Sequence, residues 1–330
     1  MLPDDAPLRF HHSCTLTLKS ILYIRQVARP APASARAAGI IAFLTAHPSR
    51  GFTISELVTH LSLNIASAHA TLAVLDEVGF VVRDPVHRTY RLGPALAATG
   101  FAVLEQHPAI PAAIEQAEIL AGELGVEATV TAVAGRDVIF LARRGPVPRS
   151  PGVGYPGDRS PLLAPIGAVF MAWAAEKDVA AWLDRAGASG PLAAFYRSIL
   201  AEARARGYTV PMPAIAAPAA IAAVKRVRAD PGDEAAERHL ADVLLKSEDT
   251  LLPLDGVPAA QEIVFETLAA PIFDPIGRAL LSLCLTGPEH PVPVEQVLAY
   301  GRRLVQAATI ATRQARGRAP GDESPFGPTA

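Results

Sequence analysis

Four basic side chains lie close together within the first hundred residues and could bind phosphate groups. Arg83, His87, Arg88 and Arg91 fall in a stretch that holds one carboxylate, Asp84. The formal net charge of the whole chain is -2, so this positive charge is local. Guanidinium groups bind the phosphate oxygens of nucleic acids without reading base sequence. We therefore predict that this stretch anchors the backbone of double-stranded DNA.

The residues just before this stretch suit the major groove of DNA. Residues 64–75 contain no carboxylate, and the apolar Ala68, Leu72 and Leu75 recur at helical spacing. A helix that enters the major groove needs small or hydrogen-bonding residues on its outer face and no negative charge beside the phosphates. The residues predicted to contact DNA from this helix are Asn64, Ser67, His69, Ala70 and Thr71.

The elements that must position these side chains follow in a recognisable order. Apolar residues at helical spacing come first, then Thr53 and Glu56 are spaced as a capping box for a second helix. Asn64 is a good N-cap for the third helix, and two strand-like runs within 80–92 form a hairpin. Together they predict a winged helix-turn-helix over residues 34–93. The alternative, a module for dimerisation or protein docking only, leaves the basic hairpin unexplained.

The rest of the chain predicts a second, larger domain. Residues 94–107 are expected to form a linker helix, and residues 108–315 mix strands and helices, which is typical of an α+β domain with an antiparallel sheet flanked by helices. Its predicted strands include 127–134, 137–143, 207–210, 263–273 and 279–286. We expect residues 1–33 to be an extension that is disordered or that results from an over-called start site, because the proline-rich string 29–33 cannot hold a helix. We expect residues 316–330 to be a disordered tail.

A row of small polar side chains marks a candidate ligand site in this domain. Ser282, Cys284 and Thr286 alternate along one predicted strand and therefore point to the same face. Such groups could hydrogen-bond a small molecule in a concave pocket. The alternative is purely structural, because cysteine is commonly buried as an apolar residue and threonine is common in strands.

The sequence offers little for catalysis, metal binding or a membrane. Cys284 has no nearby base, and the G-x-G-x-x-G match at 152–157 is crowded by prolines, so we predict no enzyme, no catalytic residue and no cofactor. His11, His12 and Cys14 lack a second ligand cluster, so no metal site is expected. The two cysteines of the chain are too few for a disulfide framework. No apolar run is long enough to span a bilayer, and the first residues lack the pattern of a signal peptide. We therefore expect a cytoplasmic protein.

Residues 34–93 resemble the DNA-binding domain of the isocitrate lyase regulator (IclR) family of transcription factors, and the second half is similar to the family's effector domain. The resemblance rests on Thr53–Leu57, Ala68–Leu72, Tyr90–Gly93, Gly157–Leu162, Gly167–Ala168, Leu268–Asp274 and Leu285–Pro288. It implies a GAF-like effector domain and a homodimer or tetramer. The ligand that it implies is a small carboxylate or aromatic metabolite. A single winged helix reads only a short half-site, so we expect an inverted-repeat operator.

The resemblance also assigns residues to the effector site and shows where this chain departs from the family. The implied effector-binding residues are Pro165, Ile166, Gly167, Ala168, Thr267, Cys284 and Thr286. We expect Gly167 to lie at a helix start whose unpaired amides favour a carboxylate. Ala70 stands where the family commonly has an arginine, and residues 211–260 resemble an insertion in place of a segment that supplies a pocket acid. Asp255 or Glu262 could supply that acid instead, or could face solvent.

Overall fold

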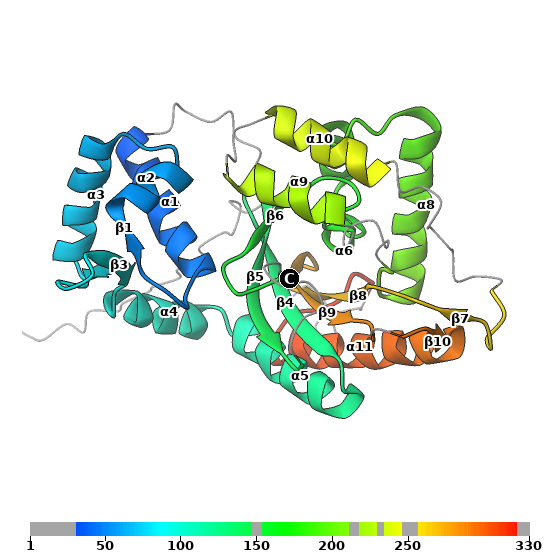
Figure 1. The fold of residues 1–330 in the computed structure, drawn as a ribbon. Helices are drawn as coiled ribbons and strands as arrows, with labels where there is room; N and C mark the ends of the chain where they lie inside the picture. The colour runs from blue at the N-terminus through cyan, green and yellow to red at the C-terminus, as the bar shows by residue number, and fades with distance from the viewer. Residues whose placement is uncertain are drawn as a thin grey trace, which may run out of the picture.

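The chain folds into two parts joined by one helix (Figure 1). The structure, a computed structural model, describes residues 31–146, 154–210, 218–229, 234–245, 257–288 and 290–321. His11, His12, Cys14 and Asp255 lie outside these ranges, as do positions 152 and 153 of the glycine-rich motif. The predictions made for them therefore stay untested.

The N-terminal part is a winged helix-turn-helix, as the sequence predicts. Its elements are α1 (Pro32–Ala46), β1 (Phe52–Thr53), α2 (Ile54–His60), α3 (Ile65–Glu77), β2 (Val81–Arg83) and β3 (Thr89–Leu92). The strands form one antiparallel sheet in the order β1-β3-β2, so the wing has a third short strand that was not predicted. Buried apolar side chains from all three helices and the sheet make a single small core, which includes Ile40, Leu44, Phe52, Leu57, Leu72 and Val81.

Two helix starts in this part follow from local chemistry. The capping box at α2 is complete: the Thr53 backbone N–H donates to Glu56 Oε2 at 2.7 Å, and the Glu56 N–H donates to Thr53 Oγ1 at 3.3 Å. Helix α1 begins at Pro32, so the prediction that residues 29–33 cannot hold a helix is wrong for its last two residues. Proline is well tolerated in the first turn of a helix, where no intrahelical partner exists for its nitrogen.

Helix α4 (Ala95–Gln106) leaves the wing and leads into α5 (Ala109–Leu124), which belongs to the second part (Figure 1). None of the residues of α4 is buried. This is unusual for a helix that contains Phe101, Val103 and Leu104, because several large apolar side chains on one helix normally pack against another part of the protein.

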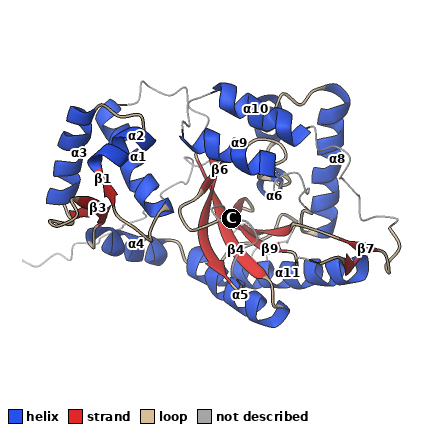
Figure 2. Cartoon of the chain, viewed as in Figure 1, coloured by secondary structure: helices blue, strands red, loops and turns tan. Residues whose placement is uncertain are grey.

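The second part is a five-stranded antiparallel sheet between two layers of helices (Figure 2). The strands are β4 (Glu127–Ala134), β5 (Asp137–Arg144), β6 (Arg159–Pro161), β8 (Thr267–Phe273) and β9 (Ala279–Thr286), in the order β6-β5-β4-β9-β8. Helices α5 and α11 (Val294–Gln314) cover one face. The other face is covered by α6 (Ala168–Met171), α7 (Glu176–Arg185), α8 (Gly190–Arg206), α9 (Pro218–Ala229) and α10 (Glu234–Leu245). This confirms the predicted α+β class.

The structure differs from the predicted elements in two places. The strand expected over 263–273 is broken, because β7 (Glu262–Ile263) pairs with β10 (Val292–Pro293) whereas β8 pairs with β9. The tail was expected to be disordered from residue 316, but the Gly317 N–H donates to the carbonyl of Thr312 and Arg318 N–H to that of Asp274. Backbone hydrogen bonds to the rest of the fold thus fix the start of this segment.

Helices α9 and α10 lie within the segment 211–260 that the resemblance marks as an insertion. They contribute Ala220, Val224, Leu240 and Leu244 to the same apolar cluster as α6, α7 and α8. They therefore form part of the helical layer over the sheet. Among the described residues, no single helix is long and apolar enough to cross a membrane, and the one pair that passes by composition, α2 with α3, is bent by 116°.

Candidate DNA interface and effector site

The exposed residues of α3 include no carboxylate before Asp76 and Glu77 at its C-terminal end. Ala68, Leu72 and Leu75 are buried against the core, whereas His69 and Ala70 are exposed. The side-chain oxygen of Asn64 is already used, because it accepts the N–H of Ala66 at 3.0 Å and that of Ser67 at 3.3 Å.

Thr71 is also turned inward, since its hydroxyl donates to the carbonyl of Ser67 at 2.8 Å within the helix. Of the five residues predicted on this helix, His69 and Ala70 are therefore the ones that are both exposed and free of such internal hydrogen bonds. Ser67 is half-buried.

The wing presents its arginines in more than one direction. Arg83, Arg88 and Arg91 are all exposed, and Arg88 takes the left-handed backbone conformation at φ 54. Arg83 lies opposite Tyr90 in the ladder and Arg91 opposite Val82, so the two guanidinium groups leave opposite faces of the hairpin. Together with Arg88 they surround the hairpin with positive charge.

His87 is tied to the wing turn. Asp84 Oδ1 accepts the backbone N–H groups of Val86 at 2.8 Å and His87 at 2.9 Å, and Asp84 Oδ2 lies 3.2 Å from His87 Nδ1. The hydrogen bond from the His87 backbone, then that from its ring and that from Val86, lower the pKa of Asp84 to about 2. Asp84 thus shapes the turn, and the positive charge of the wing rests on its arginines.

Sequence reasoning did not consider Arg50, which is also exposed in this domain. Its guanidinium lies 3.8 Å from the ring centroid of Phe52 and 2.8 Å from Glu56 Oε1. The hydrogen bond from Arg50, followed by those from Thr53, lowers the pKa of Glu56 to about 2. Because Glu56 balances its charge, Arg50 supports the start of α2 and adds little net attraction for phosphate.

In the second part, four buried polar side chains form a compact group on the face of the sheet that α6 to α10 cover. Thr129 pairs with Cys284 and Thr131 with Ser282 across β4 and β9, and all four are buried. Ser282 Oγ lies 3.2 Å from Cys284 Sγ. Burial raises the pKa of the Cys284 thiol. Hydrogen bonds with Ser282, Thr129 and Thr131 lower it, but by less than burial raises it. The thiol is therefore protonated at neutral pH and serves as a polar contact rather than a nucleophile.

The structure brings some of the predicted effector residues together and separates others. Cys284 and Ile166 belong to one buried apolar cluster, to which Leu163, Phe170, α9 and α10 also contribute. Thr267 and Thr286 lie opposite each other at the far end of the hairpin, outside that cluster. The polar groups therefore form a row along β9. It begins at Ser282 and Cys284, beneath α6 to α10, and ends at Thr286.

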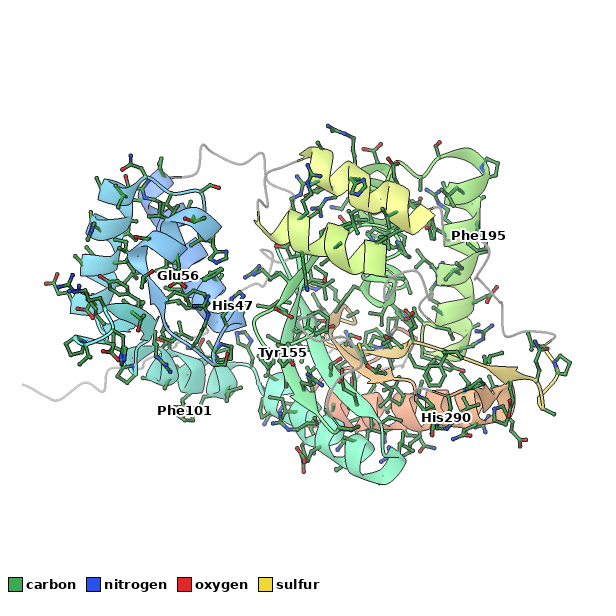
Figure 3. The ribbon with its side chains drawn as sticks, in the orientation of Figure 1. His47, Glu56, Phe101, Tyr155, Phe195 and His290 are labelled. Carbon is green, nitrogen blue, oxygen red and sulfur yellow. The ribbon has the colours of Figure 1, made fainter. Side chains whose placement is uncertain are left out.

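A half-buried ion pair lies at that end of the row. Arg143 Nη2 lies 2.6 Å from Glu127 Oε2, and each side chain is only 12% exposed. The Thr286 hydroxyl donates to Glu127 Oε1 at 3.4 Å, and the Arg143 guanidinium carbon lies 5.0 Å from the ring centroid of Tyr155. Tyr155 lies between the sheet and the N-terminal part in Figure 3.

Sequence reasoning missed Glu127, Thr129, Thr131 and Arg143. The signal was present, because Glu127, Thr129 and Thr131 alternate with alanine and valine in the same way as the polar residues of β9.

The segment 165–168 offers less than predicted. Pro165 and Ile166 are buried, and Gly167 and Ala168 are half-buried. Gly167 precedes α6 with φ 82, and a side chain there would overlap Leu162. The Ala168 N–H donates to the carbonyl of Pro165 at 3.2 Å, so the expectation of unpaired amides at this helix start is wrong for Ala168. Helix α6 has four residues, which is too short for a substantial helix dipole.

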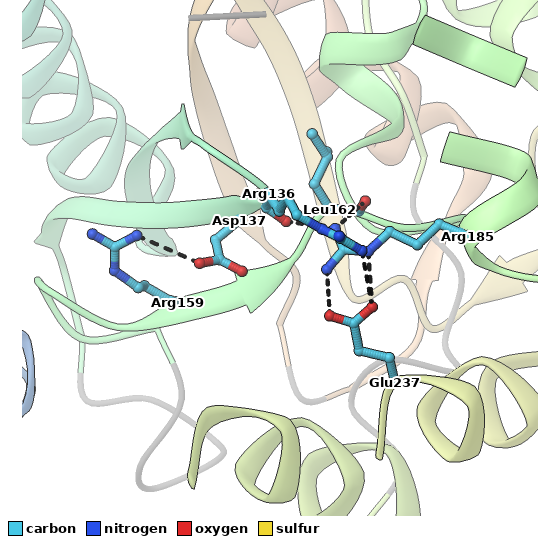
Figure 4. A network of polar contacts seen from close by, with 6 residues as sticks. All are labelled: Arg136, Asp137, Arg159, Leu162, Arg185 and Glu237. Atoms are coloured by element: carbon cyan, nitrogen blue, oxygen red, sulfur yellow. Dashed lines mark hydrogen bonds and ion pairs between the residues drawn. The ribbon is translucent and has the colours of Figure 1, made fainter. Parts of the chain in front are cut away.

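Glu237 of α10 is linked to the loop before this segment through Arg185. Glu262 is exposed on β7, so it faces solvent. Glu237 instead accepts from Arg185, whose Nη1 also donates to the carbonyls of Arg136 at 2.7 Å and Leu162 at 3.0 Å (Figure 4). Arg185 therefore joins α10 and α7 to the β4–β5 turn and to the loop that precedes α6.

No group of three or more histidine, cysteine or acidic side chains in the described ranges is arranged to hold a metal ion.

Comparison with known proteins supports this architecture. Residues 33–85 match the family model of the IclR helix-turn-helix domain. A comparison with curated proteins gives no significant match. Two solved structures are similar in fold. An IclR transcriptional regulator from Alicyclobacillus acidocaldarius has a TM-score of 0.60 at 20% identity, over 88% of this chain and 100% of its own. Pseudomonas aeruginosa HmgR has a TM-score of 0.54 at 22% identity, over 85% and 98%.

A third similar structure contains a ligand. It is an IclR homologue from Microbacterium hydrocarbonoxydans in complex with 4-hydroxybenzoate, with a TM-score of 0.55 at 16% identity over 86% of this chain and 99% of its own.

Residues 33–85 therefore match an IclR-type helix-turn-helix domain, and the chain shares the fold of the IclR regulators compared above. The match to the family model agrees with the resemblance that the sequence shows over residues 34–93.

Proposed function

We propose that the chain is a DNA-binding transcriptional regulator of the IclR type. A small organic effector controls its affinity for promoter DNA by binding at the face of the sheet that α6 to α10 cover. The proposal rests on one observation, a group of four buried polar side chains beneath α6 to α10. They are Thr129, Thr131, Ser282 and Cys284. Adjacent hydroxyl and thiol groups on an otherwise apolar sheet can orient a polar ligand. The predicted effector residue Cys284 belongs to this group, and Ile166 packs in the same cluster as Cys284.

The ligand class follows from the two ends of the polar row. The apolar cluster around Ile166 and Phe170 suits a non-polar body, and Arg143 at the other end can pair with a carboxylate in competition with Glu127. A carboxylate or aromatic metabolite fits both requirements. The similar structure that contains 4-hydroxybenzoate supports this class, because that ligand has both a ring and a carboxylate.

A homodimer that binds an inverted repeat is part of the proposal. One winged helix contacts a short half-site, so useful affinity generally needs two. Helix α4 has no buried residue, and its Phe101 is 68% exposed and projects away from both domains (Figure 3). We infer that a second copy of the chain covers this helix.

The same helix is the physical link through which an effector would act. Helix α4 connects the wing directly to α5, which packs on the sheet that carries the polar row. An effector changes DNA affinity only by as much as it favours one dimer geometry over another, typically about 1–3 kcal/mol, or about 5–150-fold.

The experiment uses the full chain. Thermal unfolding is measured against a panel of small carboxylates and aromatic acids, because a bound ligand raises the apparent stability. The affinity for operator DNA is then measured with and without each hit. We expect Cys284→Ala to weaken effector binding about two- to tenfold, because a polar contact is lost, and to leave ligand-free DNA binding unchanged.

A matched control is Ser198→Ala, which removes an exposed hydroxyl of α8 that belongs neither to the buried cluster around Cys284 nor to the polar row. If Cys284→Ala and Thr286→Val both bind an identified effector as the parent does, the effector site is elsewhere.

One observation favours a second candidate function, a partner-binding or architectural regulator without a ligand. Leu163, Ile166 and Phe170 are at most 7% exposed and are packed under α9 and α10. If no acid in the panel shifts the unfolding temperature while operator DNA is bound specifically, this second function is the better account.

A further inference from the structure

A separate cavity of about 210 Å³ lies beside β8, the edge strand of the sheet. It forms where the C-terminal ends of α8 and α11 meet the segment that follows α11. Its lining residues include Trp173, Arg204, Phe273, Thr312, Arg313 and Arg318. Three of the lining residues are arginines and none is acidic. None of them belongs to the polar row on β4 and β9.

Backbone contacts build the wall that closes this cavity. The Gly317 N–H donates to the carbonyl of Thr312 at 2.7 Å, and the Arg318 N–H donates to that of Asp274 at 3.2 Å. A side chain at Gly317 would overlap the carbonyl oxygen of Phe273, so only glycine allows this segment to lie against the end of β8. The cavity is therefore a defined feature of the fold.

The three guanidinium groups carry charge that the described part of the chain does not balance. Within that part, no carboxylate forms an ion pair with Arg204, Arg313 or Arg318, whereas Arg206 in the same turn as Arg204 pairs with Glu202 at 3.0 Å. The ends of α8 and α11 favour Arg204 and Arg313 through the helix dipole. This explanation does not cover Arg318, which follows the helix and is placed by its own backbone hydrogen bond.

The inner wall is apolar and aromatic. The rings of Trp173 and Phe273 lie edge to face with centroids 5.5 Å apart. Thr312 Oγ1 accepts the Phe273 N–H at 3.1 Å, which leaves the hydroxyl proton of Thr312 available to a ligand. A planar ring can pack on such a wall while a carboxylate meets the arginines. The volume is below the ~300 Å³ at which drug-sized sites begin, which fits a single ring.

We propose that this cavity is a second ligand site, distinct from the effector site, and that it binds single-ring aromatic carboxylates through Arg313, Arg318 and the wall formed by Trp173 and Phe273.

Tryptophan fluorescence tests the proposal locally, because the chain has two tryptophans, Trp173 and Trp182. The Trp182→Phe variant leaves Trp173 as the only indole, and benzoate is titrated into it. We expect a saturable change in emission. Adding Arg313→Gln and Arg318→Gln should weaken benzoate at least about tenfold, because two charge-assisted hydrogen bonds are lost. Arg302→Gln, an exposed arginine of α11 outside the cavity, should leave the affinity unchanged.

Two further measurements separate this site from the effector site. Benzyl alcohol, which has the ring without the charge, should bind at least about tenfold more weakly than benzoate. The Trp173→Phe variant retains Trp182, whose Nε1 donates to the carbonyl of Ile166 at 2.8 Å beneath the helical layer. A benzoate response seen only through Trp182 would place binding at the effector site and overturn the proposal.

Calorimetry on the parent protein covers the case in which Trp182→Phe does not fold. Benzoate affinity should fall at least about tenfold in Arg313→Gln/Arg318→Gln and stay at the parent value in Arg302→Gln. Equal affinity in the parent and the double variant, or no binding by the parent at millimolar benzoate, would overturn the proposal. Neither result would bear on DNA binding.

Discussion

Arg185 holds Glu237 through two parallel hydrogen bonds, from Nε to Oε2 at 2.9 Å and from Nη2 to Oε1 at 2.6 Å (Figure 4). The two side chains are 13% and 11% exposed. The third nitrogen of Arg185 donates to two backbone carbonyls, so every nitrogen of the guanidinium forms a hydrogen bond. This contact fixes α10 over the face of the sheet that carries the polar row.

We predict that Arg185→Met destabilises the protein by about 3 kcal/mol, because it leaves the Glu237 carboxylate buried without its main partner. The value is at the low end for buried pairs because both side chains keep some exposure. Arg197→Met is the control, since its pair with Glu176 is exposed and should contribute less than about 1 kcal/mol. Urea unfolding of both variants gives the two values. Equal losses would show that the Arg185 contact is no more than a surface pair.

The same pair predicts a pH dependence. Burial by itself would raise the pKa of Glu237, but the hydrogen bonds and charge of Arg185 and the charge of Arg136 outweigh it, so the pKa lies below 4.5. A carboxyl whose folded pKa is lowered contributes stability above its unfolded pKa, and this contribution is lost as the pH falls through the folded value. The unfolding temperature of the parent should therefore exceed that of Glu237→Gln at pH 6, and the difference should shrink below pH 4.5.

The pKa of Asp137 is shifted in the opposite direction to that of Glu237. The test therefore uses the difference in unfolding temperature between the parent and Glu237→Gln. Burial raises its pKa more than the nearby Arg159 and Arg185 lower it. Its ionisation therefore weakens folding as the pH rises above its unfolded pKa of 3.8. Both proteins contain Asp137, so most of this contribution cancels. A difference that grows as the pH falls would contradict the assignment to Glu237.

Local signals in the sequence predicted the DNA-binding domain well. The capping box at Thr53 and the N-cap Asn64 depend on neighbours within three residues, and both form in the structure. The polar face of β9 was also predictable, because alternation in a strand fixes which residues share a face.

The candidate effector site was harder to predict because it depends on contacts between distant segments. Glu127 meets Thr286 across 159 residues, and Arg185 meets Glu237 across 52. No local pattern specifies such partners. The internal use of Thr71 was equally hidden, since its hydroxyl can point outward or back to the helix carbonyl at the same helical position.

The geometry of α3 predicts which changes alter DNA sequence preference. His69→Ala removes an exposed hydrogen-bonding group and should change the preferred operator bases, at a cost of about 1–3 kcal/mol for the parent site. Thr71→Val removes a hydroxyl that bonds within the helix, so the preference should be unchanged. Selection of binding sites from a random duplex pool measures both. A changed preference in Thr71→Val with none in His69→Ala would reverse this assignment.

The exposure of α4 predicts the assembly state. Phe101→Asp places a charge where a second copy is proposed to pack, so we expect the dimer to dissociate at micromolar concentration and operator affinity to fall. Ile310→Asp is the control, because Ile310 is an exposed apolar residue on α11. Light scattering measures the mass of each. A monomeric parent, or a Phe101→Asp variant with the mass of the parent, would contradict the interface.

The most direct test of the DNA-binding account is the salt dependence of duplex binding. Two or three wing arginines per protomer give about four to six phosphate contacts in a dimer, so the log–log slope of affinity against salt should be about -4 to -5. Replacing Arg83, Arg88 and Arg91 by alanine should weaken binding to all duplexes alike and bring the slope close to zero. A parent slope close to zero, or an unchanged slope in the triple variant, would show that the wing does not anchor DNA.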